Sequence, residues 1–130
     1  QDVLEIPEFE YECIFKIKSS LFQRFCNELS VIGDNCEINV NKKEIIFHTK
    51  GDLGEIDLSY NLQDDENKSS EDFKLTVSLR YLNFFNKASS LSDELIISIS
   101  PDSPLFLKYN IGDTGSISYF LAPKMEDDEE

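Results

Sequence analysis

The segment that decides the fold of this chain is LRYLNFFNKA, residues 79–88. Its apolar residues recur at three- and four-residue spacing, which predicts an amphipathic helix. Arg80, Asn83 and Lys87 are three and four residues apart, so they share one face of that helix. The remaining aromatic and apolar side chains are interpreted as core residues, because such residues at helical spacing usually pack under a sheet. They are Tyr81, Leu82, Phe84 and Phe85.

Strand signals flank this helix on both sides. Residues 73–78 precede it, and segments with strand character follow at 94–100, 105–111 and 116–121. The same order occurs upstream, with a strand at 11–17, a helix at 20–32 and strands at 36–40, 45–49 and 55–60. A unit of roughly 60 residues is therefore present twice. We predict an α+β fold of two βαβββ units, each with an antiparallel sheet, and with both helices on one face.

Two segments avoid acidic residues. The chain of 130 residues has 26 acids, 12 cations and a formal net charge of −14, yet residues 13–27 and 73–92 contain six cations and no acid. Local fields, rather than the net charge, steer charged ligands. Because both segments contain a predicted helix, the pattern predicts one cationic helical face on an otherwise acidic body. Chance clustering is the alternative that charge alone leaves open.

The chain offers no catalytic constellation. His48 is the only histidine, so neither a Ser-His-acid relay nor a zinc site has the partners it needs. Residues 51–54, GDLG, lack the lysine and the spacing of a phosphate-binding loop. Cys13, Cys26 and Cys36 match no metal or redox motif and lie among apolar neighbours, which predicts buried free thiols in a reducing compartment. We expect no enzyme activity, no cofactor and no metal.

Three motifs carry a family resemblance: residues 79–88, the helix ending at 30–34, and LAPK at 121–124 before an acidic tail. They resemble the C-terminal domain of proliferating cell nuclear antigen, the eukaryotic DNA sliding clamp, and the resemblance runs from Leu4 to the end of the chain. It implies the DNA-clamp fold, in which three two-domain protomers close a ring around duplex DNA. Helices line the hole of that ring, and sheets form its outer wall.

The resemblance also implies domain bounds and partners. Residues 1–8 correspond to the end of an interdomain connector, 9–122 to the clamp domain and 123–130 to an acidic tail, so we expect a fragment of a longer protein. The whole protein would be a nuclear homotrimer and a processivity factor. Its partners would be double-stranded DNA, bound without sequence preference, DNA polymerase, the clamp loader and other proteins carrying a PIP box, the peptide motif Gln-x-x-aliphatic-x-x-aromatic-aromatic.

Three sets of site residues follow from the resemblance. The DNA-facing positions are Lys16, Arg24, Asn27, Arg80, Asn83 and Lys87. The partner-peptide groove is formed by Leu4, Ile6, Pro7, Ser78, Pro104, Phe120, Ala122, Pro123, Lys124 and Met125. The subunit interface, which pairs with the first domain of the neighbouring protomer, is formed by Leu53, Gly54, Glu55, Ile56, Asp57 and Leu58. Without that first domain, we expect this fragment to be monomeric or weakly self-associating.

Two other function classes remain open at this point. A checkpoint-type clamp subunit would share the fold. An acidic module that binds histones or other basic proteins would instead use the acidic remainder and the tail at 126–130, for which a solubilising role is the simpler interpretation. Salt separates the classes, because binding of a basic protein by charge is screened at high ionic strength, whereas an apolar-anchored peptide is much less affected.

Overall fold

The computed structural model describes residues 11–63, 66, 71–101 and 103–124. The order of its elements is the predicted one. In chain order they are β1 (Cys13–Lys18), α1 (Ser19–Ile32), β2 (Asn35–Val40), β3 (Glu44–Gly51), β4 (Gly54–Asn61), β5 (Phe73–Ser78), α2 (Leu79–Phe85), the 3-10 helix η1 (Asn86–Leu91), β6 (Glu94–Ile99), β7 (Leu105–Ile111) and β8 (Gly115–Leu121). The helix predicted at 79–88 is thus α-helical for its first two turns and continues as η1.

The strands pair across the duplication rather than within each unit. Sheet A has the order β1-β6-β7-β8, and sheet B has the order β4-β3-β2-β5, with antiparallel neighbours throughout. The prediction that each unit forms its own sheet is therefore wrong, because each unit gives its first strand to the other sheet. The reason is the strand–helix junction. Helix α1 begins directly after β1 and is 14 residues long, about 21 Å, and the strand that follows it, β2, lies in sheet B.

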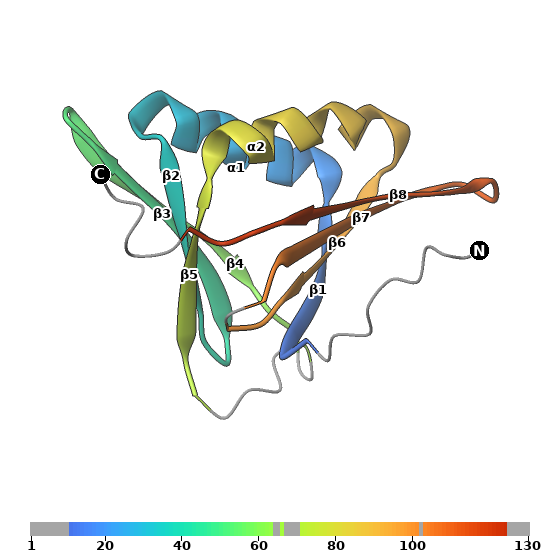
Figure 1. Cartoon of the computed structure of the whole chain (residues 1–130), viewed down its shortest axis with the longest axis horizontal. Coiled ribbons are helices and arrows are strands. Elements are labelled where there is room, and N and C mark those ends of the chain that lie inside the picture. The colour runs from blue at the N-terminus through green and yellow to red at the C-terminus, as the bar shows by residue number, and fades with distance from the viewer. Residues whose placement is uncertain (1–10, 64–65, 67–70, 102, 125–130) are drawn as a thin grey trace.

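Both helices lie on the same side of the two sheets (Figure 1), as the repeat predicts. Helices α1 and α2 contact each other. The Nδ2 group of Asn83 on α2 donates a hydrogen bond to Ser30 Oγ on α1, which joins the exposed sides of the two helices. Fold class and helix placement are confirmed. Within the described residues, neither helix is long and apolar enough to span a membrane.

The core lies between the helices and the inner faces of the two sheets. Phe22 and Phe25 of α1 contact the ring of Phe47 on β3, with centroids 6.1 and 5.6 Å apart. On sheet A, the buried hydroxyl of Tyr109 donates a hydrogen bond to Asn86 Oδ1 at the start of η1, over 3.1 Å. Alternation in the strands sends every second side chain to the outer face, so each sheet has one buried and one accessible face.

The three cysteines are free and buried, as predicted. Burial raises the pKa of the Cys13 and Cys26 thiols to about 12 and also raises that of Cys36. Protonated thiols are poor nucleophiles and poor metal ligands, so these residues act as small apolar side chains.

The interpretation of the α2 aromatics as core residues is wrong for two of them. Leu82 is buried and Phe85 stacks on Tyr119, but Tyr81 is 50% exposed and Phe84 is 57% exposed. A helix turns only one stripe of side chains toward the core, and on α2 that stripe starts from Leu79 and Leu82. Phe84 therefore points outward, as Tyr81 does. The ammonium of Lys87 lies 5.1 Å from the centre of the Phe84 ring.

Candidate functional site

The exposed side of the helix pair gathers five of the six predicted DNA-facing residues. Arg24 and Asn27 on α1 are exposed, as are Arg80 at the start of α2 and Lys87 in η1. Asn83 is half-buried, because its amide bridges to α1 and also donates to the Leu79 carbonyl. These residues come from α1, α2 and η1, which contact one another and lie on the same side of the two sheets (Figure 1).

One acid reduces the charge of this helical face. Glu28 Oε2 lies 3.6 Å from Arg24 Nε, one turn along α1, and both side chains are largely exposed at 45% and 67%. An exposed pair of this kind is worth at most about 1 kcal/mol, so Arg24 can leave it for a phosphate. No acidic residue occurs in α2.

Lys16 does not join this set. It lies in β1, where Phe15 and Ile17 turn into the core and the residues between them turn outward. The helices pack on the inner face of sheet A, so the side chain of Lys16 stands on the opposite face. Its backbone carbonyl accepts a hydrogen bond from the Tyr60 hydroxyl over 2.7 Å.

The outer face of sheet A carries a cluster of aromatic rings around Phe120. Phe106 on β7 and Phe120 on β8 are cross-strand partners with ring centroids 4.8 Å apart. Tyr11 stacks on Phe106 at 6.3 Å, and its hydroxyl donates a hydrogen bond over 3.4 Å to the carbonyl of Pro104. We call Tyr11, Phe106 and Phe120 the aromatic row. Phe120 remains 43% exposed, so the row presents apolar surface to a ligand.

Tyr11 and Phe106 are absent from the groove predicted from sequence. Phe106 could have been found from register, because it alternates with the buried Leu105 and Leu107 and lies opposite Phe120. Tyr11 could not. The sequence extends the first strand to residue 11, but β1 begins at Cys13, so alternation does not set the direction of the Tyr11 side chain.

The end of the chain's last strand links the two sheets. After β8, the backbone N–H of Lys124 donates to the Thr76 carbonyl on β5 over 2.7 Å, and its Nζ donates to Asn35 Oδ1 over 3.3 Å. Asn35 is the cross-strand partner of Ser78, so Ser78 and Lys124 lie close together. Ala122 is exposed and Pro123 half-buried on the segment between the sheets. The other predicted groove residues, Leu4, Ile6, Pro7 and Met125, lie outside the described residues.

The predicted subunit-interface residues lie on an edge strand. In the described part of the chain, β4 pairs only with β3, so its other side presents N–H and C=O groups for pairing. Ile56 and Leu58 turn toward the core, whereas Glu55 and Asp57 are exposed. Leu53, in the turn before the strand, is 96% exposed, and Gly54 adopts a φ of 156° that side chains disfavour.

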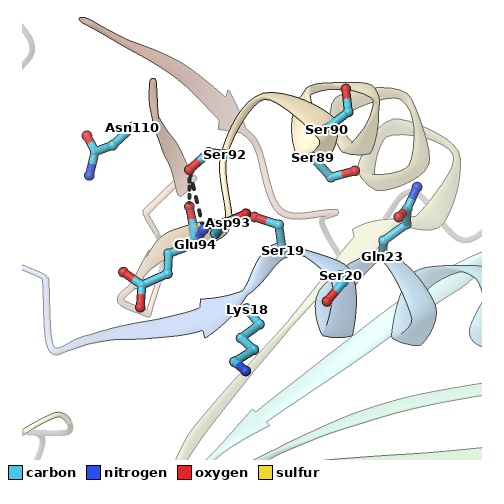
Figure 2. Close-up of a pocket in the computed structure, with 10 residues that line it drawn as sticks. All are labelled: Lys18, Ser19, Ser20, Gln23, Ser89, Ser90, Ser92, Asp93, Glu94 and Asn110. Atoms are coloured by element: carbon cyan, nitrogen blue, oxygen red, sulfur yellow. Dashed lines mark hydrogen bonds between the residues drawn. The ribbon is translucent and has the colours of Figure 1, made fainter. Parts of the chain in front are cut away.

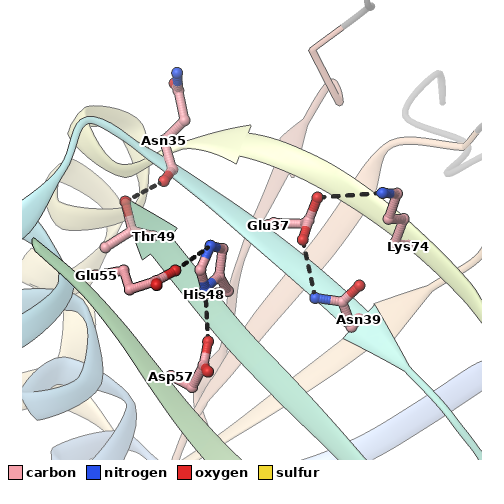
Figure 3. A network of polar contacts seen from close by, with 8 residues as sticks. All are labelled: Asn35, Glu37, Asn39, His48, Thr49, Glu55, Asp57 and Lys74. Atoms are coloured by element: carbon pink, nitrogen blue, oxygen red, sulfur yellow. Dashed lines mark hydrogen bonds and ion pairs between the residues drawn. The ribbon is translucent and has the colours of Figure 1, made fainter. Parts of the chain in front are cut away.

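The only histidine of the chain, His48, contacts two acidic residues of this edge strand. Nδ1 of His48 lies 2.6 Å from Asp57 Oδ1, and its Nε2 lies 3.8 Å from Glu55 Oε1 (Figure 3). The three side chains stand on the outer face of sheet B, where Glu37 pairs with Lys74 at 3.4 Å. His48 is thus part of a surface network of polar contacts that couples β3 to β4.

A polar cavity of about 770 Å³ lies beside the start of α1 (Figure 2). Side chains from α1, η1 and β6 line it, including Gln23, Ser89, Asp93 and Glu94. Serines, Lys18 and Asn110 also line it, and no histidine or cysteine is among its lining residues. In the described part of the chain, no group of histidine, cysteine and acidic residues could hold a metal ion.

A duplicated βαβββ domain with two sheets outside and two helices on one side is the building block of a sliding clamp. The family model described as "Proliferating cell nuclear antigen, C-terminal domain" matches residues 5–124. The chain belongs to this family, whose members serve DNA replication as clamps and not as enzymes.

Proposed function

We propose that this chain is the second domain of a clamp protomer that encircles duplex DNA and tethers replication and repair proteins to it in the nucleus. The observation that supports this most directly is that α1, α2 and η1 contact one another and carry the exposed residues Arg24, Arg80 and Lys87. The rest of the chain is strongly acidic, with a net charge of −14 overall. A cationic face on an acidic body confines DNA to one side of the domain.

Contact with DNA would be through phosphates alone. The charged groups of Arg24, Arg80 and Lys87 lie at the ends of long, flexible side chains, which suits contact with phosphates. Phosphate contacts position a protein without carrying sequence information. Asn27 and Asn83 add neutral hydrogen-bonding groups between the cations. This arrangement suits a protein that slides on DNA.

The aromatic row would receive the anchors of PIP-box peptides. By the family resemblance, Leu4, Ile6 and Pro7 would form one wall of this groove and Met125 would extend it at the other end; all four lie outside the described residues. Burying each apolar anchor contributes roughly 1.5–3 kcal/mol. After the cost of ordering the peptide, this supports micromolar affinity, about −8 kcal/mol.

Assembly would use the open edge of β4. Its alternation of Glu55 and Asp57 with Ile56 and Leu58 suits a strand that continues a sheet into a neighbouring domain. We propose a trimeric ring for the whole protein, and a monomer for these 130 residues studied alone, because the β4 edge would pair with a clamp first domain and not with a second copy of itself.

Calorimetry with one PIP-box peptide and one short DNA duplex tests this function. We expect micromolar peptide binding that changes little between 0.1 and 0.5 M salt, and weak DNA association that salt abolishes. Failure of the peptide to bind, together with salt-sensitive capture of histones, would instead identify an acidic basic-protein-binding module. Peptide binding without ring assembly of the full-length protein would favour a checkpoint-type subunit.

A further inference from the structure

The outer face of sheet A carries a row of lysines beside the aromatic row. Lys16 on β1 is the cross-strand partner of Ile96 on β6, and Ile96 is the partner of Lys108 on β7. These three side chains, which we call the lysine row, therefore stand in line on one face of the sheet. Two strand spacings separate the lysines, about 10 Å.

Both lysines of this row are available for a ligand. Lys16 is exposed and Lys108 half-buried, and neither forms an ion pair with a described residue. In the next row, Lys18 stands opposite Glu94. The carboxylate of Glu66, which lies near Ile14, accepts a hydrogen bond from the Gln63 N–H over 2.7 Å.

The strands of this face have the opposite sign to the chain as a whole. Among the strand residues on the outer face of sheet A, Lys16, Lys18 and Lys108 face a single acid, Glu94, in a chain of net charge −14. The pattern is separate from the cationic helix pair, because the core lies between them. Charge complementarity therefore points to an acidic ligand on this face.

The two rows are one step apart along the strands. Phe106 and Lys108 are two residues apart on β7 and turn to the same face, which places them about 7 Å from each other. An extended peptide advances about 3.3 Å per residue, so an acidic residue two or three positions from an aromatic anchor reaches the lysine row. Ile96 between the lysines supplies apolar surface for their stems.

We propose that the lysine row selects partner peptides in which acidic residues flank the aromatic anchors. This inference rests on the proposed peptide groove and names its preferred ligand: an aromatic pair in the groove, with Asp or Glu two to three residues away over Lys16 and Lys108. The two lysines distinguish peptides with acidic flanks from peptides without them. The anchors supply most of the affinity, since exposed ion pairs contribute less than apolar burial.

The test compares synthetic peptides that share one PIP-box sequence and differ in the flank. One peptide carries Asp-Asp after the aromatic pair, one carries it before the pair, and the controls carry Asn-Asn at the same places. We expect at least one acidic peptide to bind the wild-type chain roughly five- to tenfold more tightly than its Asn control at 0.05 M salt. The preference should shrink below twofold at 0.5 M salt, because screening is stronger there.

Reversing the charge of the two lysines tests whether they cause the preference for acidic peptides. Lys16→Glu with Lys108→Glu should remove or invert the preference while leaving the affinity for the Asn peptides within twofold. The matched control is Lys50→Glu, an exposed lysine on sheet B, which should keep the preference. Thermal melts of each variant verify that the domain is folded.

Each remaining outcome has a separate meaning. Equal binding of acidic and Asn peptides to the wild type, or an unchanged preference in the double variant, overturns the inference and leaves the groove intact. Absence of binding by all the peptides overturns the groove as well. If the double variant instead loses DNA association as Arg80→Ala is expected to do, the lysine row is a nucleic-acid contact and the inference is wrong.

Discussion

Replacing Phe120 with alanine removes the most accessible ring of the aromatic row. Phe120 is 43% exposed, and the rest of its side chain is covered, in part by Phe106 with ring centroids 4.8 Å apart. A partner can bury only the exposed part. Full burial of a Phe side chain contributes about 1.5–3 kcal/mol, so the exposed fraction contributes about 0.6–1.3 kcal/mol to binding. The expected loss of peptide affinity is about three- to ninefold.

The same substitution lowers the stability of the domain to a limited extent. The covered part of the ring contributes about 1–2 kcal/mol by the same area relation. A domain of this size typically has 5–15 kcal/mol of unfolding free energy, so Phe120→Ala should remain folded. A thermal melt beside the binding experiment separates loss of the groove from loss of the fold.

Calorimetry with one PIP-box peptide is the decisive assay, and two variants serve as controls. Phe120→Tyr keeps the ring and should bind within twofold of the wild type. Arg80→Ala lies on the helix pair, on the other side of the core, and should leave peptide affinity unchanged. If Arg80→Ala weakens peptide binding as much as Phe120→Ala, the separation of the two sites is refuted.

Further predictions address the helical face, the packing, the thiols and the assembly. Arg80→Ala and Lys87→Ala should each weaken association with any DNA sequence and reduce the slope of log K against log salt by about one, measured by fluorescence anisotropy. Gly51→Ala should lower the unfolding free energy in urea by about 1–3 kcal/mol, since its Cβ would lie 1.9 Å from the Ile32 carbonyl oxygen; unchanged stability would contradict this packing. Burial raises the pKa of Cys26 from 9.0 to about 12, so above pH 9 the unfolded state binds fewer protons and stability should fall as pH rises toward 12, less steeply in Cys26→Ala, as urea melts at each pH will check. Light scattering should find this chain monomeric, and a stable closed trimer of the chain alone would refute the role assigned to the β4 edge.

Local patterns predicted the elements of the fold because they depend on neighbours in sequence. The strand and helix order, the positions of β2 to β8 and the buried faces of α1 all follow from periods of two and three to four residues. The end of α2 is an exception. Spacing alone does not reveal that the chain tightens into η1 at Asn86, whose side chain accepts a buried hydrogen bond from Tyr109, far along the sequence.

The site was predictable to a smaller degree. The exposure of Arg80 on α2 and of Lys87 in η1 agrees with the face that their spacing predicts, and the repeat predicts that the helix carrying Arg24 lies beside them. Lys16 was grouped with them by resemblance and by the absence of acids, but the parity of β1 places it on the opposite face of sheet A. The sequence shows that Lys16 and Phe15 point to opposite faces of β1. It does not show on which of those faces the helices pack.

The sequence by itself determined the duplicated α+β pattern, the buried side of each element and the cationic helices, because these depend on short-range periodicity and on the chain's own charges. Only the tertiary structure decided that the two units exchange their first strands, that Tyr11 and Phe106 join Phe120, and that Lys16 and Lys108 stand in one row. Which strands pair depends on the burial of apolar side chains that are distant in sequence. Several different pairings could bury these side chains in one core. The chain direction set by α1 and α2 selects among those pairings, and local sequence does not encode that direction.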